Sequence, residues 1–63
     1  MENCIKKFRK LYKWTQEELA DRLGVCRQTV IMAEQSKNDP GLELAFRMAR
    51  IFNCTIEELF YYK

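Results

Sequence analysis

The sequence predicts an all-α fold, a compact bundle of five short helices. Apolar residues recur at three- and four-residue spacing along the chain, and the helix-start motif Thr-x-x-Glu occurs at both Thr15 and Thr55. No segment alternates apolar and polar residues with a period of two, so we expect no β-sheet. With 63 residues, the chain fits a single domain, 1–63, near the lower size limit for a hydrophobic core.

Caps and breaks set the bounds of the first two expected helices. The first runs from a cap at Asn3 to about Lys13. The second begins at Thr15, which forms a capping box with Glu18, and ends at Gly24, which suits the left-handed residue after a helix. Apolar residues at helical spacing are expected to line their inner faces: Ile5, Phe8, Leu11, Tyr12, Leu19, Ala20 and Leu23.

The third expected helix, over about 27–35, lacks the usual start. Cys26 stands where serine or threonine is preferred, which costs about 1 kcal/mol of capping. A thiol at a helix N-terminus beside Arg27 is also in an environment that lowers a cysteine pKa. One hypothesis is therefore a redox-sensitive cysteine, and the other is a tolerated small residue.

The last two helices are expected after the turn residues 38–41. One covers about 42–52, and the other begins at Thr55, forms a capping box with Glu58 and ends near Phe60. The inner face of the helix over 42–52 is expected to hold Leu42, Ala45, Met48, Ala49 and Phe52.

Composition indicates a globular chain and excludes several classes of protein. Hydrophobic residues make up 48% of the sequence and charged residues 32%, which is typical of folded domains. Three widely spaced cysteines and no histidine argue against a metal site and a disulfide scaffold. We find no nucleophile–base pair and no glycine-rich phosphate loop, so we expect neither an enzyme nor a bound cofactor or small-molecule ligand.

The charge pattern gives a modest signal for nucleic acid. The net charge is only +2, but residues 1–14 hold five cations against one anion, Glu2. This basic segment suits phosphate contact, although a solvated lysine face explains it equally well. No apolar run approaches the roughly 20 residues of a membrane span and no signal peptide is evident, so we expect a cytoplasmic protein with no membrane partner.

Residues 15–30 suggest two short helices joined by a tight glycine turn, the second opening with long polar side chains. This is the pattern of a helix-turn-helix, whose second helix enters the major groove of DNA. Over Ile5–Tyr61 the sequence resembles the Cro/CI-type, or XRE-type, family of phage repressors and small bacterial regulators. The resemblance implies a lambda-repressor-like DNA-binding domain with the motif at about 15–35. Its matching segments are Thr15–Ala20, Leu23–Val25, Arg27–Val30, Glu34, Pro40, Leu42, Leu44–Ala45 and Ile56–Phe60.

The resemblance implies sequence-specific binding to double-stranded DNA as a homodimer on a two-fold operator. We expect the dimer to be weak and to form fully on DNA. The implied base-contacting residues are Arg27, Gln28, Ile31 and Met32. The implied phosphate-contacting residues are Thr15, Gln16, Thr29, Lys37 and Asn38, with Lys6 and Lys10 as weaker candidates.

Two further sets of residues match positions of the family. An arginine on its first helix and a glutamate late in its third form an ion pair that supports the recognition helix, and Arg9 and Glu34 stand at these positions. Arg9 is therefore expected to be structural. The C-terminal aromatic residues are expected either to pack on the core or to form the dimer interface: Phe60, Tyr61 and Tyr62.

Ile31 and Met32 depart from the family, which places polar or basic side chains there. They are expected either to contact thymine methyl groups or to form an apolar patch that binds another protein. We expect a bacterial or phage-encoded transcriptional regulator, a repressor rather than an activator, with no effector domain. The alternative is a protein-interaction module of the same fold that has lost specific DNA binding. A Cro-like protein and the antitoxin of a toxin–antitoxin pair fit the sequence equally well.

Overall fold

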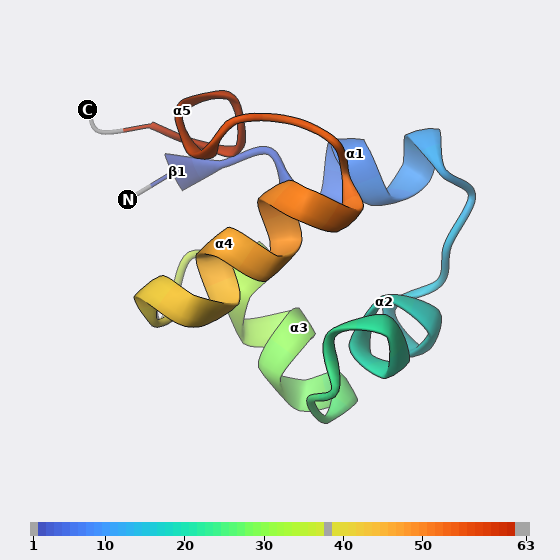
Figure 1. Cartoon of the computed structure of the whole chain (residues 1–63). Coiled ribbons are helices and arrows are strands. Elements are labelled where there is room, and N and C mark those ends of the chain that lie inside the picture. Colours follow the sequence, from blue (N-terminus) through green and yellow to red (C-terminus); the bar gives the residue numbers. More distant parts are fainter. Residues whose placement is uncertain (1, 38, 62–63) are drawn as a thin grey trace.

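Five helices surround one hydrophobic core in the computed structural model, which describes residues 2–37 and 39–61 (Figure 1). The predicted all-α class is confirmed, and each helix begins and ends within two residues of its expected bounds. The helices are α1 (Ile5–Leu11), α2 (Gln16–Leu23), α3 (Arg27–Glu34), α4 (Leu42–Ile51) and α5 (Ile56–Leu59).

The two ends of the described chain pair as a short antiparallel ribbon. Strand β1 (Glu2–Asn3) lies beside β2 (Phe60–Tyr61), with Asn3 opposite Phe60. The Cys4 amide continues the pairing by donating to the Leu59 carbonyl at 2.8 Å. The expectation of no β-sheet is therefore wrong, because strands of two residues are too short to show an alternating pattern.

Helix α1 is shorter than expected at both ends. Cys4 occupies the N-cap position, while Asn3 lies in β1 and accepts a hydrogen bond from the Ile5 amide at 3.1 Å. At the other end Tyr12 is the C-cap residue, and Leu11 is 68% exposed. The predicted burial of Leu11 is wrong because it lies about 120° around the helix from Ile5. Tyr12 lies almost above Ile5, but its predicted burial is wrong as well, since Tyr12 follows the last residue of α1 and is 42% exposed.

Aromatic rings connect the C-terminal ends of α1 and α4. Tyr12 stacks on Trp14 with ring centroids 4.8 Å apart, and Trp14 stacks on Phe52 at 5.8 Å. The Tyr12 hydroxyl also donates to the Phe52 carbonyl at 2.8 Å. The Arg22 guanidinium lies 4.3 Å from the Trp14 centroid, so a cation–π contact brings α2 into the same cluster.

Each of the five helices contributes at least one side chain to the core. The largest fully buried side chains are Phe52, Ile5, Leu19, Leu23, Met48, Leu59 and Val30. The predicted burial of Leu42 is wrong, since this residue is 71% exposed. Leu42 is the first residue of α4, and the buried residues of this helix begin one turn later, at Ala45.

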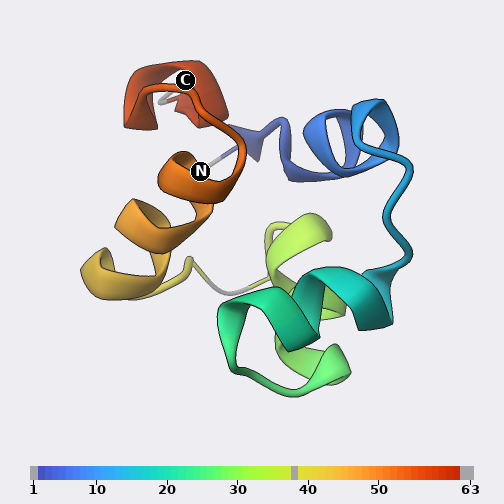
Figure 2. The same cartoon turned by 45° about the vertical axis from the view of Figure 1, so that its right-hand side comes forward.

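Helices α2 and α3 form the helix-turn-helix, and Figure 2 shows the turn between them at the end of the molecule opposite the chain termini. Gly24 ends α2 with φ of 73°, a left-handed conformation that favours glycine. Arg47 of α4 donates to the Leu23 carbonyl at 3.2 Å and so binds the C-terminal end of α2.

Both predicted capping boxes are present. At the start of α2, the Thr15 hydroxyl accepts from the Glu18 amide at 3.0 Å, and the Glu18 carboxylate accepts from the Thr15 amide at 2.8 Å. Thr55 and Glu58 make the corresponding pair at the start of α5. Both helix starts therefore have side-chain partners for amides that lack a partner within the helix.

We predict that the first capping box makes stability depend on acidic pH. Hydrogen bonds from the Thr15 backbone and side chain lower the pKa of Glu18, so the unfolded chain takes up a proton at higher pH than the folded chain. The stabilisation is complete above the ordinary glutamate pKa of about 4.3 and is lost as pH falls through the lowered folded value. Glu18→Gln should therefore reduce the free energy of unfolding at pH 7 and have little effect at the acid limit.

Urea unfolding of both proteins between pH 7 and pH 2 measures this difference. Glu17→Gln is the matched control, because Glu17 lies on the same helical turn and takes no part in the capping box. A difference between wild type and Glu18→Gln that stays constant over the whole pH range would contradict the prediction.

Candidate nucleic-acid interface

The first two residues of α3 are exposed, whereas the side of the helix that faces the core is buried. Arg27 and Gln28 are exposed, whereas Val30 and Ala33 are buried in the core. Of all the pairs of elements, α2 and α3 pack most extensively against each other. The two long polar side chains therefore project from a helix that is fixed from behind, as a base-contacting surface requires.

Ile31 and Met32 are half-buried, whereas the sequence predicts that both side chains face outward. Met32 lines a hollow at the junction of α3 and α4, together with Pro40 and Leu44. Of the four predicted base contacts, Arg27 and Gln28 are thus the exposed ones. Partial burial also reduces the apolar patch that a protein partner would need.

The expected ion pair between Arg9 and Glu34 is present and largely buried. Arg9 Nε donates to Glu34 Oε2 at 2.6 Å, and Arg9 Nη2 donates to Glu34 Oε1 at 3.4 Å. The two side chains are 11% and 5% exposed. Arg9 Nη1 also donates to the Trp14 carbonyl at 2.9 Å, so one guanidinium connects α1, the segment before α2 and the end of α3.

Gln16 joins this network, which the sequence does not indicate. Its side-chain nitrogen Nε2 donates to Glu34 Oε1 at 3.1 Å. A carboxylate only accepts hydrogen bonds, so the amide nitrogen of Gln16 faces Glu34, and one further amide hydrogen is left for another acceptor. Gln16 is therefore held in place by α3 and has donor capacity for a phosphate group.

A polar hollow of about 420 Å³ lies between the starts of α2 and α3. The first turn of α2 directs backbone amides outward, and two guanidinium groups and a side-chain amide lie nearby. Such donors suit an anionic oxygen, whereas a carboxylate at the rim opposes one. The residues that line the hollow are Arg9, Thr15, Gln16, Glu17 and Arg27.

The other predicted phosphate-contacting residues differ in their surroundings, since some already have a partner within the protein and others are exposed. The Thr15 hydroxyl accepts from the Glu18 amide, and the Thr29 hydroxyl lies 3.2 Å from Cys26 Sγ. Asn38 lies outside the described residues. The predicted lysines are all exposed: Lys6, Lys10 and Lys37.

The predicted dimer interface at the C-terminus is corrected for one residue. Phe60 is 9% exposed and belongs to the core, because β2 directs successive side chains to opposite faces. Tyr61 is on the outer face and is 41% exposed. Tyr62 lies outside the described residues.

Within residues 2–37 and 39–61, no three histidine, cysteine, aspartate or glutamate side chains are grouped to hold a metal ion. No helix of this part of the chain has the length and apolar character needed to cross a membrane.

We predict that Arg9→Met lowers the free energy of unfolding by about 3–5 kcal/mol, because the buried Glu34 carboxylate loses its cationic partner. This is a large part of the stability of so small a domain, so the variant should be mostly unfolded in urea that leaves the wild type folded. The double variant Arg9→Met, Glu34→Met should be more stable than Arg9→Met alone, since no unpaired charge remains. Additive losses in a double-mutant cycle would contradict this account.

The matched control is Glu43→Gln, which removes an exposed ion pair. Glu43 and Arg47 lie 2.8 Å apart on α4 with side chains 81% and 54% exposed. Such a pair contributes about 0.5 kcal/mol or less, so urea unfolding should barely change.

We further predict that Cys26 reacts with iodoacetamide several-fold faster than Cys54 at pH 7. Hydrogen bonds from Thr29 lower the pKa of the exposed Cys26 thiol, whereas burial raises the pKa of Cys54. The reactive thiolate is therefore more populated at Cys26. Peptide mass spectrometry after brief alkylation measures the two rates, with the urea-unfolded chain as control; equal rates in the folded protein would contradict the prediction.

Comparison with known proteins places these features in a family. Residues 5–59 match the family described as Helix-turn-helix. An uncharacterized HTH-type transcriptional regulator of Methanocaldococcus jannaschii is 49% identical over 63 residues, which are 100% of this chain and 96% of the relative. The HTH-type regulator YgzD of Bacillus subtilis is 34% identical over 61 residues, 97% of this chain and 92% of the relative.

A solved structure agrees with the fold. The crystal structure of the hypothetical transcription factor NHTF from Neisseria superposes with a TM-score of 0.78 at 28% identity and covers 86% of this chain. This chain covers 61% of the Neisseria protein, less than two thirds of its length. The match over residues 5–59, together with relatives of nearly equal length, shows that the chain belongs to the helix-turn-helix family of transcriptional regulators, of the XRE type that its sequence resembles.

Proposed function

We propose that this chain binds a specific site in double-stranded DNA with α3 in the major groove and represses transcription as a homodimer. The observation that carries the proposal is the exposed pair Arg27 and Gln28 on the first turn of a helix that is fixed from behind. An arginine binds guanine O6 and N7 with two hydrogen bonds, and a glutamine binds adenine N6 and N7 in the same way. Each such contact discriminates against the wrong base by about 1–3 kcal/mol.

Phosphate contacts at the hollow between α2 and α3 would fix the register of α3 in the groove. Gln16 and the first backbone amides of α2 are the proposed donors, beside the guanidinium of Arg27. The exposed lysines add attraction that does not depend on sequence: Lys6, Lys10 and Lys37. Binding should therefore weaken steeply as salt concentration rises.

A two-fold operator is proposed from the size of one protomer. The domain measures 28 × 22 × 19 Å, and successive major grooves on one face of DNA lie about 34 Å apart. Two such domains side by side can place one α3 in each groove. Occupation of a site that overlaps a promoter represses without further contacts, which is why we favour a repressor over an activator.

The protein-interaction alternative has weak support. It depends on the Ile31 and Met32 patch, and both residues are half-buried. Binding to DNA that is insensitive to salt and to base sequence would favour it.

Selection from a randomised duplex pool, followed by binding of the enriched site, tests the proposal. We predict a two-fold consensus and an affinity that falls steeply between about 50 and 200 mM salt. Gln28→Ala should reduce discrimination at one base pair of each half-site by about 1–3 kcal/mol. Gln35→Ala is the matched control, since Gln35 is also exposed but lies at the opposite end of α3. No enriched site, or equal effects of the two variants, would overturn the proposed base recognition.

A further inference from the structure

A side chain of the N-terminal strand holds the C-terminal end of α3. Asn3 of β1 donates from Nδ2 to the Ala33 carbonyl at 2.8 Å and to Ser36 Oγ at 3.3 Å. Its Oδ1 accepts from the Ile5 amide at 3.1 Å. A side-chain amide has two N–H groups and one carbonyl oxygen, so each of these groups of Asn3 has a partner. One side chain thus connects β1, the start of α1 and the end of α3.

The backbone that Asn3 contacts leaves α3 in a Schellman motif. The Ser36 amide donates to the Ala33 carbonyl at 3.1 Å, and the Lys37 amide donates to the Met32 carbonyl at 3.2 Å. Ser36 has φ of 58°, a left-handed conformation that is strained for residues other than glycine. The Ala33 carbonyl has two lone pairs and accepts from both Ser36 and Asn3, so Asn3 supports the strained turn from outside.

The ribbon of β1 and β2 fixes Asn3 itself. Asn3 lies opposite Phe60, which is 9% exposed and belongs to the core. The Cys4 amide donates to the Leu59 carbonyl at 2.8 Å, directly beside this pair. A terminal strand that is paired in this way is tied down, whereas a free chain end would be poorly ordered. The support for α3 therefore comes from a well-anchored part of the molecule.

Lys37 is the residue on which this support acts. It directly follows Ser36, is exposed and is one of the lysines proposed to contact phosphate. A lysine whose backbone is already ordered loses less conformational freedom on binding than a lysine on an unsupported turn. The path of the backbone out of α3 also decides where the ammonium group can reach.

We propose that Asn3 is a positioning residue for DNA binding, which holds the Schellman motif at the end of α3 and so directs Lys37 to the phosphate backbone. Asn3 acts through Lys37 and does not itself contact DNA. The inference rests on the proposed function for the phosphate contact, and it adds a residue that lies outside the helix-turn-helix. The terminal ribbon thereby takes part in binding.

Binding of the enriched site at several salt concentrations tests the inference. Asn3→Ser is the variant, because a serine hydroxyl still accepts from the Ile5 amide but is too short to reach the Ala33 carbonyl. Lys37→Ala removes a phosphate contact and should reduce the slope of log affinity against log salt by about 1 per bound protomer. Asn3→Ser should reduce it by about 0.5–1, although it removes no charge. A merely structural role of Asn3 would leave this slope unchanged in the folded protein.

A double-mutant cycle shows whether Asn3 acts through Lys37. In the Lys37→Ala background, Asn3→Ser should have no further effect on affinity. Ser36→Gly should restore the slope of Asn3→Ser, because glycine adopts the left-handed conformation without support. Additive effects of Asn3→Ser and Lys37→Ala, or a wild-type slope for Asn3→Ser, would overturn the proposal.

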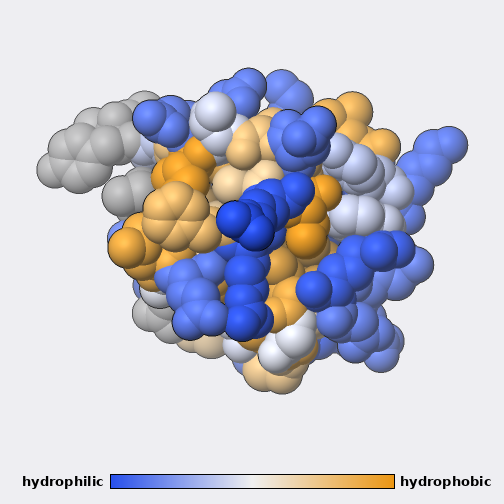
Figure 3. Space-filling view, in the orientation of Figure 1, coloured by the Kyte–Doolittle hydropathy of each residue, from blue (hydrophilic) through white to orange (hydrophobic). Residues whose placement is uncertain are grey.

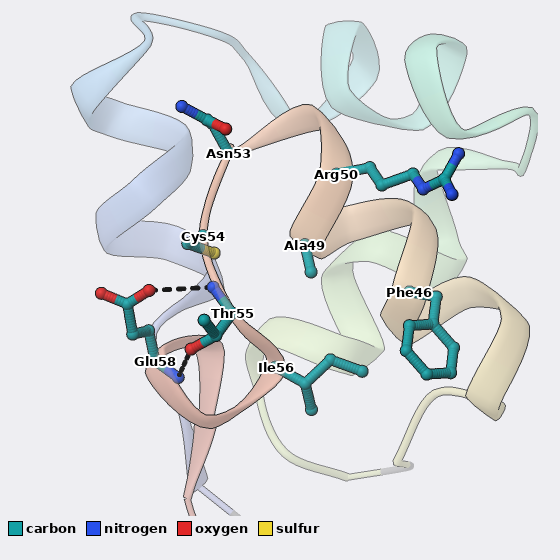
Figure 4. A pocket seen from close by; sticks show the side chains of 8 residues that line it. All are labelled: Phe46, Ala49, Arg50, Asn53, Cys54, Thr55, Ile56 and Glu58. Atoms are coloured by element: carbon teal, nitrogen blue, oxygen red, sulfur yellow. Dashed lines mark hydrogen bonds between the residues drawn. The ribbon is translucent and has the colours of Figure 1, made fainter.

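Thr55→Ala is the matched control for lost stability. It removes the capping box of α5, in which Thr55 and Glu58 make two hydrogen bonds (Figure 4). Thr55 lines a hollow of about 540 Å³ together with Phe46 and Ile56. Figure 3 shows hydrophobic residues gathered on the side of the molecule where α4 and α5 lie, and such a surface does not suit a phosphate backbone. Thr55→Ala should therefore reduce stability and keep the wild-type salt slope; a loss of slope equal to that of Asn3→Ser would overturn the proposal.

Hydrogen exchange of the Ser36 and Lys37 amides separates this inference from the proposed function, because it needs no DNA. Asn3→Ser should speed exchange at both amides several-fold relative to Thr55→Ala. Unchanged exchange would overturn the positioning role whether or not the wild type binds DNA. If exchange is faster but the wild type enriches no DNA site, Asn3 holds the motif and the proposed function fails.

Circular dichroism must first show that Asn3→Ser is folded. If it is not, Ser36→Ala takes its place in both measurements, since it removes one acceptor of Asn3 and leaves β1 intact. The same outcomes then support or overturn the proposal.

Discussion

The buried ion pair between Arg9 and Glu34 is the interaction on which the arrangement of the first three helices depends. Both charged side chains are largely buried, so each must keep its partner and its remaining hydrogen bonds in the folded state. Arg9 satisfies this condition with the Trp14 carbonyl, and Glu34 with the Gln16 amide. A displacement of α1, α2 or α3 would break part of this set.

The same network gives α3 one fixed end and one free end. At the C-terminal end, Glu34 is bound by two side chains and the Ala33 carbonyl accepts from Asn3 Nδ2 at 2.8 Å. At the N-terminal end, Arg27 and Gln28 reach solvent from a helix that Val30 anchors in the core. Side chains carried on a rigid element are positioned more precisely than those on a loop, so α3 is suited to present a binding surface.

Local chemistry made much of this fold predictable. Both capping boxes and the glycine turn depend on residues at most a few positions apart, so the sequence alone indicates them. Periodicity identified most of the buried residues but misplaced Leu11, Tyr12 and Leu42, because it does not reveal where a helix face leaves the core. The pairing of Asn3 with Phe60 joins opposite ends of the chain, and nothing local marks it.

The candidate site likewise combines features that the sequence indicates with features that only the packing of the helices determines. The exposed first turn of α3 follows from its position after the glycine turn, and a family resemblance suggested the pairing of Arg9 with Glu34. The bond from Gln16 to Glu34 spans elements that are distant in sequence, and no spacing rule predicts it. The exposure of Phe46 is likewise a property of packing, since it depends on which side of α4 the other helices cover.

The ribbon of β1 and β2 has a consequence for how such a domain can be built into larger proteins. It brings Glu2 and Tyr61 side by side, at the end of the molecule opposite the turn before α3 (Figure 1). A segment joined beyond either strand would leave on the side away from the start of α3. The domain is in this sense modular, because fusion at either terminus leaves the first turn of α3 exposed, and neighbouring termini also permit insertion into a host loop with little distortion. The similarity to a longer Neisseria protein, of which this chain covers 61%, shows the same fold within a larger chain.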